Sequence, residues 1–176
     1  NSSESSANQT LKLVKKNKVE ASIIQSDLSN EKNCIKLIKD TEKKIGEVSI
    51  LINNASTFKK NTLENTSSRE IEEDFYVNLI APFILCKAIF RKSNKGKVIN
   101  ISDWKTARTN RFSYGVSKAA IYGLTKSLSL SMAPNYQVNE IALGAILPPA
   151  DAPNRKTESI NLGPIGRTAK IEEVTS

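Results

Sequence analysis

Histidine is absent from this 176-residue sequence, and cysteine occurs only twice. The first absence excludes a Ser-His-Asp triad and any metal site built on imidazole. Cys34 and Cys86 lie within helical patterns and lack a C-x-x-C spacing, so neither a structural zinc nor a disulfide is expected. We interpret them as core thiols in a reducing compartment, which predicts a cytoplasmic protein without a metal. Proton chemistry must then use tyrosine, lysine, serine or carboxylate side chains.

The sequence also lacks an apolar run of 18 residues, so no membrane-spanning helix is predicted. The formal net charge is +8, yet aromatic residues make up only 6% and are not interleaved with the lysines, so no nucleic-acid partner is expected. The spread of lysines along amphipathic patterns indicates a solvated surface; a mild attraction for an anionic ligand such as a dinucleotide phosphate fits equally well. The length suits a single domain over residues 1–176.

The stretch from Gly96 to Lys126 combines a short apolar strand with a helix that carries ionisable side chains. The β-branched run Val98–Ile101 predicts a buried strand that ends near Asp103. The following helix places Tyr114 and Lys118 one turn apart on the same face. Because α/β sheets bind ligands where strands end and helices begin, these three side chains predict a functional site.

Tyr114 is the predicted general acid or base of this site. A phenol in water has a pKa of about 10, and a nearby ammonium lowers that pKa, so Lys118 is expected to make Tyr114 usable at neutral pH. Tyr122 and Lys126 match the same spacing. We prefer Tyr114 because it lies in the first turn of the helix, near the strand end, and we interpret Tyr122 as a packing or interface residue.

Helical and strand patterns alternate along the rest of the chain. Helices are predicted from the opening serines to about Lys16, from a cap at Ser29 or Asn30 to about Ile45, over Ser68–Arg91, from Ser113 to about Met132, and in a capped segment near Thr168. Further strands are predicted over Val19–Asp27, Val48–Ile52 and Gln137–Ile146. This alternation predicts an α/β fold with a parallel, doubly wound sheet.

Several polar residues have two interpretations each. Asn53 and Asn54 directly follow a buried strand, where they either pin neighbouring strand ends or face a ligand. Asn78 is a poor helix former in the middle of a helix, which indicates a structural or catalytic role. Ser2 and Ser3 either cap the first helix or form an anion site at its N-terminus.

These motifs, in this order and spacing, resemble the short-chain dehydrogenase/reductase family. The residues that carry the resemblance are Asp27-Leu28, Asn53-Asn54-Ala55, Asn78, Asn100-Ile101, Tyr114-x-x-x-Lys118 and the strand before Pro148. The resemblance implies a Rossmann-like, three-layer α/β/α fold and hydride transfer from a nicotinamide cofactor. It also implies that Tyr114 supplies the proton, that Lys118 holds the nicotinamide ribose, and that Asn78 supports a water chain toward Lys118.

A branch within the family is indicated as well. Asp103 stands where the family usually has serine, and Asn-Ala-Ser-x-Phe replaces Asn-Ala-Gly, as in the pteridine reductases and dihydromonapterin reductases. This similarity implies NADPH-dependent reduction of a dihydropterin-like C=N, with Phe58 stacking on the pterin. The implied substrate contacts are Ser56, Phe58, Asp103 and Tyr114. The implied cofactor contacts are Ser2, Ser3, Asp27, Leu28, Asn54, Ala55, Ser56, Ile101, Tyr114, Lys118 and Ile146, with Ser2 and Ser3 at the 2′-phosphate.

Two other functions are compatible with the same residues. The first is a carbonyl reductase of the same family that acts on a C=O, such as a 3-oxoacyl thioester or a sugar. The second is a non-catalytic dinucleotide-binding module, because a fold alone does not establish activity. Phe58 and Asp103 favour the pterin, since a carboxylate can pair with the donors of a 2-amino-pyrimidine edge.

The sequence departs from the family pattern in three ways. Leu143-Gly144 replaces the usual Pro-Gly, and the loop from Asp103 to Tyr114 is shorter than usual. The glycine-rich first strand and turn, the second strand and the seventh strand have no counterpart here, so we interpret the chain as an internal fragment, incomplete at both ends. Val19–Ser26 would then have no native neighbour to pair with. Family members often pair through the helices that hold Asn78 and Tyr114, which implies a homo-oligomer, a dimer or tetramer, for the full-length protein.

Overall fold

A computed structural model describes residues 4–91, 95–146 and 166–175 of the chain. Three parallel strands form its sheet in the order β1-β2-β3: β1 (Ile50–Asn53), β2 (Gly96–Asp103) and β3 (Tyr136–Leu143). Asn53 of β1 pairs with Asn100 of β2, and Asp103 pairs with the last residue of β3. The carboxyl ends of the strands therefore lie along one edge of the sheet. The predicted parallel α/β fold is confirmed.

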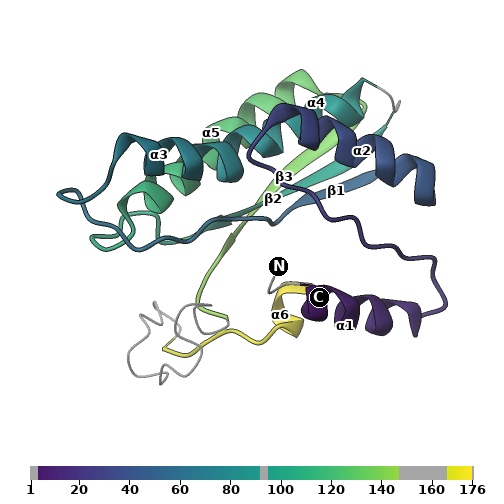
Figure 1. Ribbon diagram of the computed structural model, residues 1–176, viewed down its shortest axis with the longest axis horizontal. Coiled ribbons are helices and arrows are strands. Elements are labelled where there is room, and N and C mark those ends of the chain that lie inside the picture. Colours follow the sequence, from purple (N-terminus) through teal and green to yellow (C-terminus); the bar gives the residue numbers. More distant parts are fainter. Residues whose placement is uncertain (1–3, 92–94, 147–165, 176) are drawn as a thin grey trace.

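One layer of helices covers one face of this sheet (Figure 1). It consists of α2 (Glu31–Ile45), α3 (Ser68–Phe75), a π-helical turn η1 (Tyr76–Ile80), α4 (Ala81–Phe90) and α5 (Phe112–Ser131). The predicted cap begins α2, because Asn30 accepts from the Asn33 N–H, and α3 begins with a capping box of Ser67 and Glu70 that the sequence analysis did not predict. The core lies between these helices and the sheet, and it contains both cysteines as free thiols.

The remaining helices, α1 (Glu4–Lys15) and α6 (Glu172–Thr175), lie on the other side of the sheet from this layer (Figure 1). No residue of α1 is buried. The face of β1 that carries Ile50 and Ile52 is likewise open, since these side chains are 56% and 57% exposed, and β1 pairs only with β2 among the described residues, which leaves its outer edge unpaired. The sheet is thus packed on one face and open along β1. Ser2 and Ser3, predicted at the 2′-phosphate, lie outside the described residues.

Two sequence expectations about strands were wrong. Val19–Asp27 forms no strand, and the chain there has no partner strand among the described residues. A strand exists only through its ladder, so a strand-like sequence without a neighbour stays unpaired. The last strand ends at Leu143 rather than Ile146, because the Ala145 carbonyl instead accepts from the Ala169 N–H at 2.9 Å. The predicted long helix over Ser68–Arg91 is present, but the π-helical turn that contains Asn78 divides it.

Candidate active site

The carboxyl end of β2 and the first turn of α5 bring together the residues predicted to do proton chemistry. The Tyr114 hydroxyl donates to Asp103 Oδ2 at 2.9 Å. Tyr114 is only 7% exposed, so the hydrogen bond lies in a largely water-excluded place. Lys118, one turn along α5, is buried and donates from Nζ to the Ile101 carbonyl at 2.8 Å. The helical spacing and the strand end thus place Tyr114, Lys118, Asp103 and Ile101 side by side, as the sequence predicted.

The pKa of Tyr114 moves in the opposite direction to the sequence expectation. Burial raises the pKa of the phenol above its usual value of about 10, and the negative charge and hydrogen bond of Asp103 raise it further. The guanidinium groups of Arg108 and Arg111 oppose this rise. The Lys118 ammonium donates to the Ile101 carbonyl and lies 6.0 Å from the centroid of the Tyr114 ring, and it does not reverse this rise of the Tyr114 pKa. Burial also lowers the pKa of Lys118 itself, against the charges of Asp103 and Glu140.

Arg108 is a residue of this site that the sequence analysis missed. It lies in the loop between β2 and α5 and donates from Nη2 to Asp103 Oδ2 at 2.7 Å. The other carboxylate oxygen, Oδ1, accepts from the Lys105 N–H at 2.8 Å. Both oxygens of Asp103 are therefore engaged within the protein, and one of them is shared by a phenol and a guanidinium.

Phe58 lies against Tyr114, as expected for an aromatic wall of the site. The two ring centroids are 4.6 Å apart with an interplanar angle of 80°. Arg111, also missed from sequence, places its guanidinium carbon 3.4 Å from the Phe58 centroid and donates to the Phe58 carbonyl at 2.6 Å. The Arg111 guanidinium thus covers one face of the Phe58 ring.

Asn78 ties the loop after β1 to α5. Its Oδ1 accepts from the Thr57 N–H at 2.9 Å and from the Ser56 hydroxyl at 3.0 Å, and its Nδ2 donates to the Ser117 hydroxyl at 2.9 Å. Ser56, predicted to contact cofactor and substrate, is therefore oriented by Asn78. Lys118 is not among the partners of Asn78 within the part of the chain described here, so the predicted water chain stays a prediction.

A second buried cluster anchors the start of α5, next to Tyr114. Asn61 Nδ2 donates to the Ser113 hydroxyl at 2.6 Å, and that hydroxyl donates to Asp74 Oδ2 at 2.5 Å. Asp74 and Ser113 are completely buried. The sequence analysis missed this cluster, because Asp74 follows two other carboxylates, Glu72 and Glu73, on the same helix. The cluster fixes the loop after Phe58 onto the helix that carries Tyr114.

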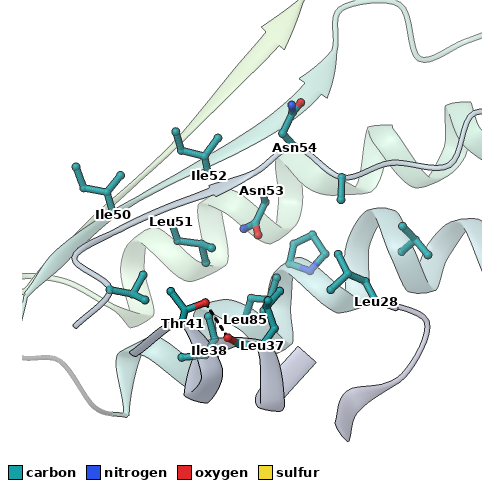
Figure 2. A pocket seen from close by; sticks show the side chains of 14 residues that line it. Leu28, Leu37, Ile38, Thr41, Ile50, Leu51, Ile52, Asn53, Asn54 and Leu85 are labelled. Atoms are coloured by element: carbon teal, nitrogen blue, oxygen red, sulfur yellow. Dashed lines mark hydrogen bonds between the residues drawn. The ribbon is translucent and has the colours of Figure 1, made fainter. Parts of the chain in front are cut away.

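The two adjacent asparagines after β1 have different roles. Asn53 Nδ2 donates to Asn100 Oδ1 at 2.8 Å, and Asn100 in turn donates to Thr125 Oγ1 at 2.9 Å, so Asn53 pins neighbouring strands and α5. Asn54 is exposed and points to the opposite side of the strand (Figure 2). Of the two interpretations open from sequence, pinning applies to Asn53. Asn54 is free to face a ligand.

A hollow of about 330 Å³ runs along the open side of β1 (Figure 2). Three predicted cofactor contacts line it: Leu28, Asn54 and Ala55. Asp27 lines a neighbouring hollow, and Ile146 lies half-buried beyond the end of β3. The predicted cofactor residues with described positions thus form one group around Lys118 and another beside β1, both at the carboxyl ends of strands.

None of the helices that the structure describes is both long and apolar enough to cross a membrane. Within the same ranges, no three histidine, cysteine or carboxylate side chains gather as they would around a metal ion.

Comparisons with known proteins place this geometry in a family. A family model for short chain dehydrogenases matches residues 1–159. An uncharacterized oxidoreductase of Thermotoga maritima is 32% identical over 133 residues, which cover 73% of this chain and 52% of that protein. The 3-oxoacyl-[acyl-carrier-protein] reductase FabG of Aquifex aeolicus is 30% identical over 169 residues, 90% of this chain and 67% of the relative.

A solved structure gives the same assignment. FolM alternative dihydrofolate reductase 1 from Brucella canis, complexed with NADP, superposes with a TM-score of 0.81 at 27% identity, over 94% of this chain and 68% of that one. The chain spans about half the length of the Thermotoga relative that it matches. With a family model matched over most of its length, the chain belongs to the short-chain dehydrogenase family.

Proposed function

We propose that the protein is an NADPH-dependent reductase of a pterin-like ring, in which a C=N receives the hydride and Tyr114 supplies the proton. The observation that carries the proposal is the hydrogen bond from Tyr114 to Asp103, with Phe58 at the edge of the Tyr114 ring. An acid, a carboxylate and an aromatic wall within one site suit a flat heterocycle with hydrogen-bond donors. The likeness to a dihydrofolate reductase of the FolM type supports the same substrate class.

The described residues fit a nicotinamide dinucleotide. The hollow beside β1 offers Asn54 and Ala55 at the end of a strand, where dinucleotides lie in this fold class. An ammonium has three donors, and Lys118 gives one to the Ile101 carbonyl, so it retains donors for the ribose hydroxyls. The NADP seen in the FolM structure supports the choice of cofactor. When bound, the reduced nicotinamide supplies the hydride.

The chain's own residues supply the proton and hold the ring. Tyr114 donates its proton to the nitrogen that receives the electron pair of the C=N, and solvent reprotonates the phenolate. A phenol whose pKa is raised stays protonated at neutral pH, so Tyr114 is poised as an acid rather than as a base. Phe58 stacks on the ring with the face that Arg111 leaves uncovered.

Asp103 has few hydrogen-bond acceptor positions left for the substrate. A carboxylate accepts about four hydrogen bonds, and Asp103 already accepts from Tyr114, Arg108 and the Lys105 N–H. The remaining acceptor position lies on Oδ1. We therefore expect a single hydrogen bond between Asp103 and the amino-pyrimidine edge, rather than a bidentate pair.

A carbonyl reductase is the second candidate. The 30% identity to a 3-oxoacyl reductase over 90% of this chain favours it, and so does the same Tyr114 chemistry with a carbonyl oxygen as proton acceptor. A non-catalytic dinucleotide-binding module is the third, and the hydrogen-bonded Tyr114 argues against it.

The test compares substrates on the protein as its gene encodes it. NADPH oxidation is followed with dihydrobiopterin, dihydromonapterin, an acetoacetyl thioester and glucose in parallel. Turnover confined to the pterins supports the proposal, and turnover of the thioester or sugar alone replaces it with the second candidate.

Tyr114→Phe should lower turnover by at least about 100-fold, the usual effect of losing a general acid, with NADPH still bound. Tyr122→Phe is the matched control, because Tyr122 is 58% exposed, and it should retain turnover. Equal turnover by both variants would overturn the role of Tyr114 as proton donor, whereas NADPH binding by the parent protein without turnover of any of the four substrates would support the non-catalytic module.

We also propose a cytoplasmic homo-oligomer. Free, buried cysteines fit a reducing compartment. Apolar side chains remain exposed on α4 and α5, among them Phe83, Phe90 and Val116, and a second copy would cover them. Light scattering coupled to size-exclusion chromatography tests the assembly, and a monomer would overturn it.

A further inference from the structure

The loop between β2 and α5 places a cation on the same carboxylate oxygen that holds the Tyr114 hydroxyl. Asp103 Oδ2 accepts from Tyr114 at 2.9 Å and from Arg108 Nη2 at 2.7 Å. The side chains of Arg108 and Asp103 are 25% and 11% exposed. This ion pair is therefore more desolvated than an ordinary surface pair, and its geometry constrains Asp103 more strongly.

The loop that carries Arg108 is seated on the helix of Tyr114 at a glycine. A Cβ built on Gly115 would lie 2.0 Å from the Thr106 carbonyl oxygen and 3.9 Å from the backbone nitrogen of Arg108. No other residue type leaves room for this approach of loop backbone to helix. Gly115 thus permits the close packing that brings Arg108 onto Asp103, independently of the ion pair itself.

The Asp103 carboxylate also needs this cation for its orientation. Its Oδ1 is fixed by the Lys105 N–H, and its Oδ2 has only Tyr114 and Arg108 as hydrogen-bond partners among the described residues. Without Arg108, the carboxylate would keep its charge beside Tyr114 but lose the group that offsets that charge. The other charged groups around Tyr114 are Arg111, which lies over Phe58, and Lys118, which is held by the Ile101 carbonyl.

We propose that Arg108 is a positioning residue for proton donation: through Asp103 Oδ2, it fixes and partly neutralises the carboxylate that holds the Tyr114 hydroxyl in place in the site. The proposal rests on the proposed function of Tyr114 as proton donor. Arg108 itself contacts neither substrate nor cofactor in this assignment. It acts only through Asp103, so its effect must vanish when the Asp103 charge is removed.

The first experiment needs no turnover. The protein as its gene encodes it is labelled with ¹³Cζ-tyrosine, and Tyr114→Phe identifies the Tyr114 resonance. Arg108→Met should shift that resonance, because the hydrogen bond from Tyr114 to the carboxylate changes. Arg108→Lys, which keeps the positive charge, should give a resonance close to that of the parent protein. The resonance of exposed Tyr122 should not move. An unmoved Tyr114 resonance in a folded Arg108→Met protein overturns the proposal, whatever the substrate proves to be.

The second experiment is a double-mutant cycle on the best substrate from the parallel assay. Arg108→Met should lower kcat about tenfold, less than the loss of about 100-fold or more expected when the acid itself is removed, with little change in KM or in NADPH affinity. In an Asp103→Asn background, the same substitution should change kcat less than about twofold. Arg69→Met, which removes an exposed arginine paired with Glu73 on α3, is the control and should leave kcat unchanged.

The outcomes separate the two proposals. A tenfold loss that persists in the Asp103→Asn background shows that Arg108 acts by another route, and the positioning proposal fails while the proposed function stands. If Tyr114→Phe itself leaves turnover intact, the proposed function fails, and the shift of the Tyr114 resonance still decides whether Arg108 orients the phenol. A circular dichroism melt of each variant identifies any that do not fold, and Arg108→Gln, which also removes the charge, then replaces Arg108→Met in the cycle.

Discussion

A single methyl group at Gly115 should impair the site more than it impairs the fold. In Gly115→Ala, the new Cβ would lie 2.0 Å from the Thr106 carbonyl oxygen, whereas real contacts to Cβ essentially never fall below 3.0 Å. The loop between β2 and α5 must therefore move by about 1.0 Å, the difference between these two distances. A misplacement of about 1 Å next to reacting groups can cost about 100-fold in rate, so kcat should fall by roughly that factor.

The effect of Gly115→Ala on stability should be smaller. Overpacking typically costs about 1–3 kcal/mol, and replacing a helical glycine by alanine returns about 0.5–1 kcal/mol. The net destabilisation should be about 0–2.5 kcal/mol. Gly123→Ala is the matched control on the same helix, because nothing lies within 4 Å of its Cβ position, and it should stabilise the protein slightly with unchanged kcat. Urea unfolding and steady-state kinetics measure both quantities. If the two alanine variants have the same kcat, the close packing of the loop on α5 is not needed for the reaction.

Three further predictions concern Arg111, the neighbours Asn53 and Asn54, and the buried thiol of Cys86. Arg111→Met should raise the KM for a flat heterocycle several-fold and leave the KM for NADPH unchanged, since the guanidinium fixes the Phe58 ring from one side; equal KM values in variant and parent would contradict this role. Asn53→Leu should destabilise the protein by about 1–3 kcal/mol in urea unfolding because it removes the hydrogen bond to the buried amide oxygen of Asn100 on β2. Asn54→Leu, its exposed neighbour, should change stability by less than about 0.5 kcal/mol and weaken NADPH binding; the opposite pattern would reverse the assigned roles. Burial raises the pKa of the Cys86 thiol from 9.0 to about 11, so the folded state holds this proton more tightly than the unfolded chain. Stability should therefore be constant below pH 9 and fall as the pH rises from about 9 to about 11, and Cys86→Ala should flatten that part of the urea-midpoint profile.

The features that were predictable from sequence are those set by local periodicity. Tyr114 and Lys118 lie on one face of a helix because four residues make about one turn. The cap at Asn30 could be anticipated because capping depends on side chains within three residues of the helix start. Asp103 could be placed at the site because the apolar run before it defines where the strand ends.

The features that were not predictable depend on what lies beside a residue rather than on its sequence neighbours. Val19–Asp27 has the composition of a strand but forms none; the family resemblance already implied that its neighbours are missing, whereas the loss of the strand itself was not predicted. The pKa of Tyr114 was expected to fall because Lys118 is one turn away. In the folded chain burial and Asp103 dominate, and both raise it.

The amino-acid sequence alone determined the family, the alternation of strands and helices, and the identity of the acid on α5, because each of these depends on spacing along the chain. Only the tertiary structure decided that Asn53 points into the protein while Asn54 points out (Figure 2), and that Arg108 and Arg111 belong to the site. Arginines in an irregular loop have no periodic pattern that could reveal their partners. Their positions follow from two sets of contacts. The loop packs onto Gly115, and the buried cluster around Asp74 joins segments that are far apart in sequence.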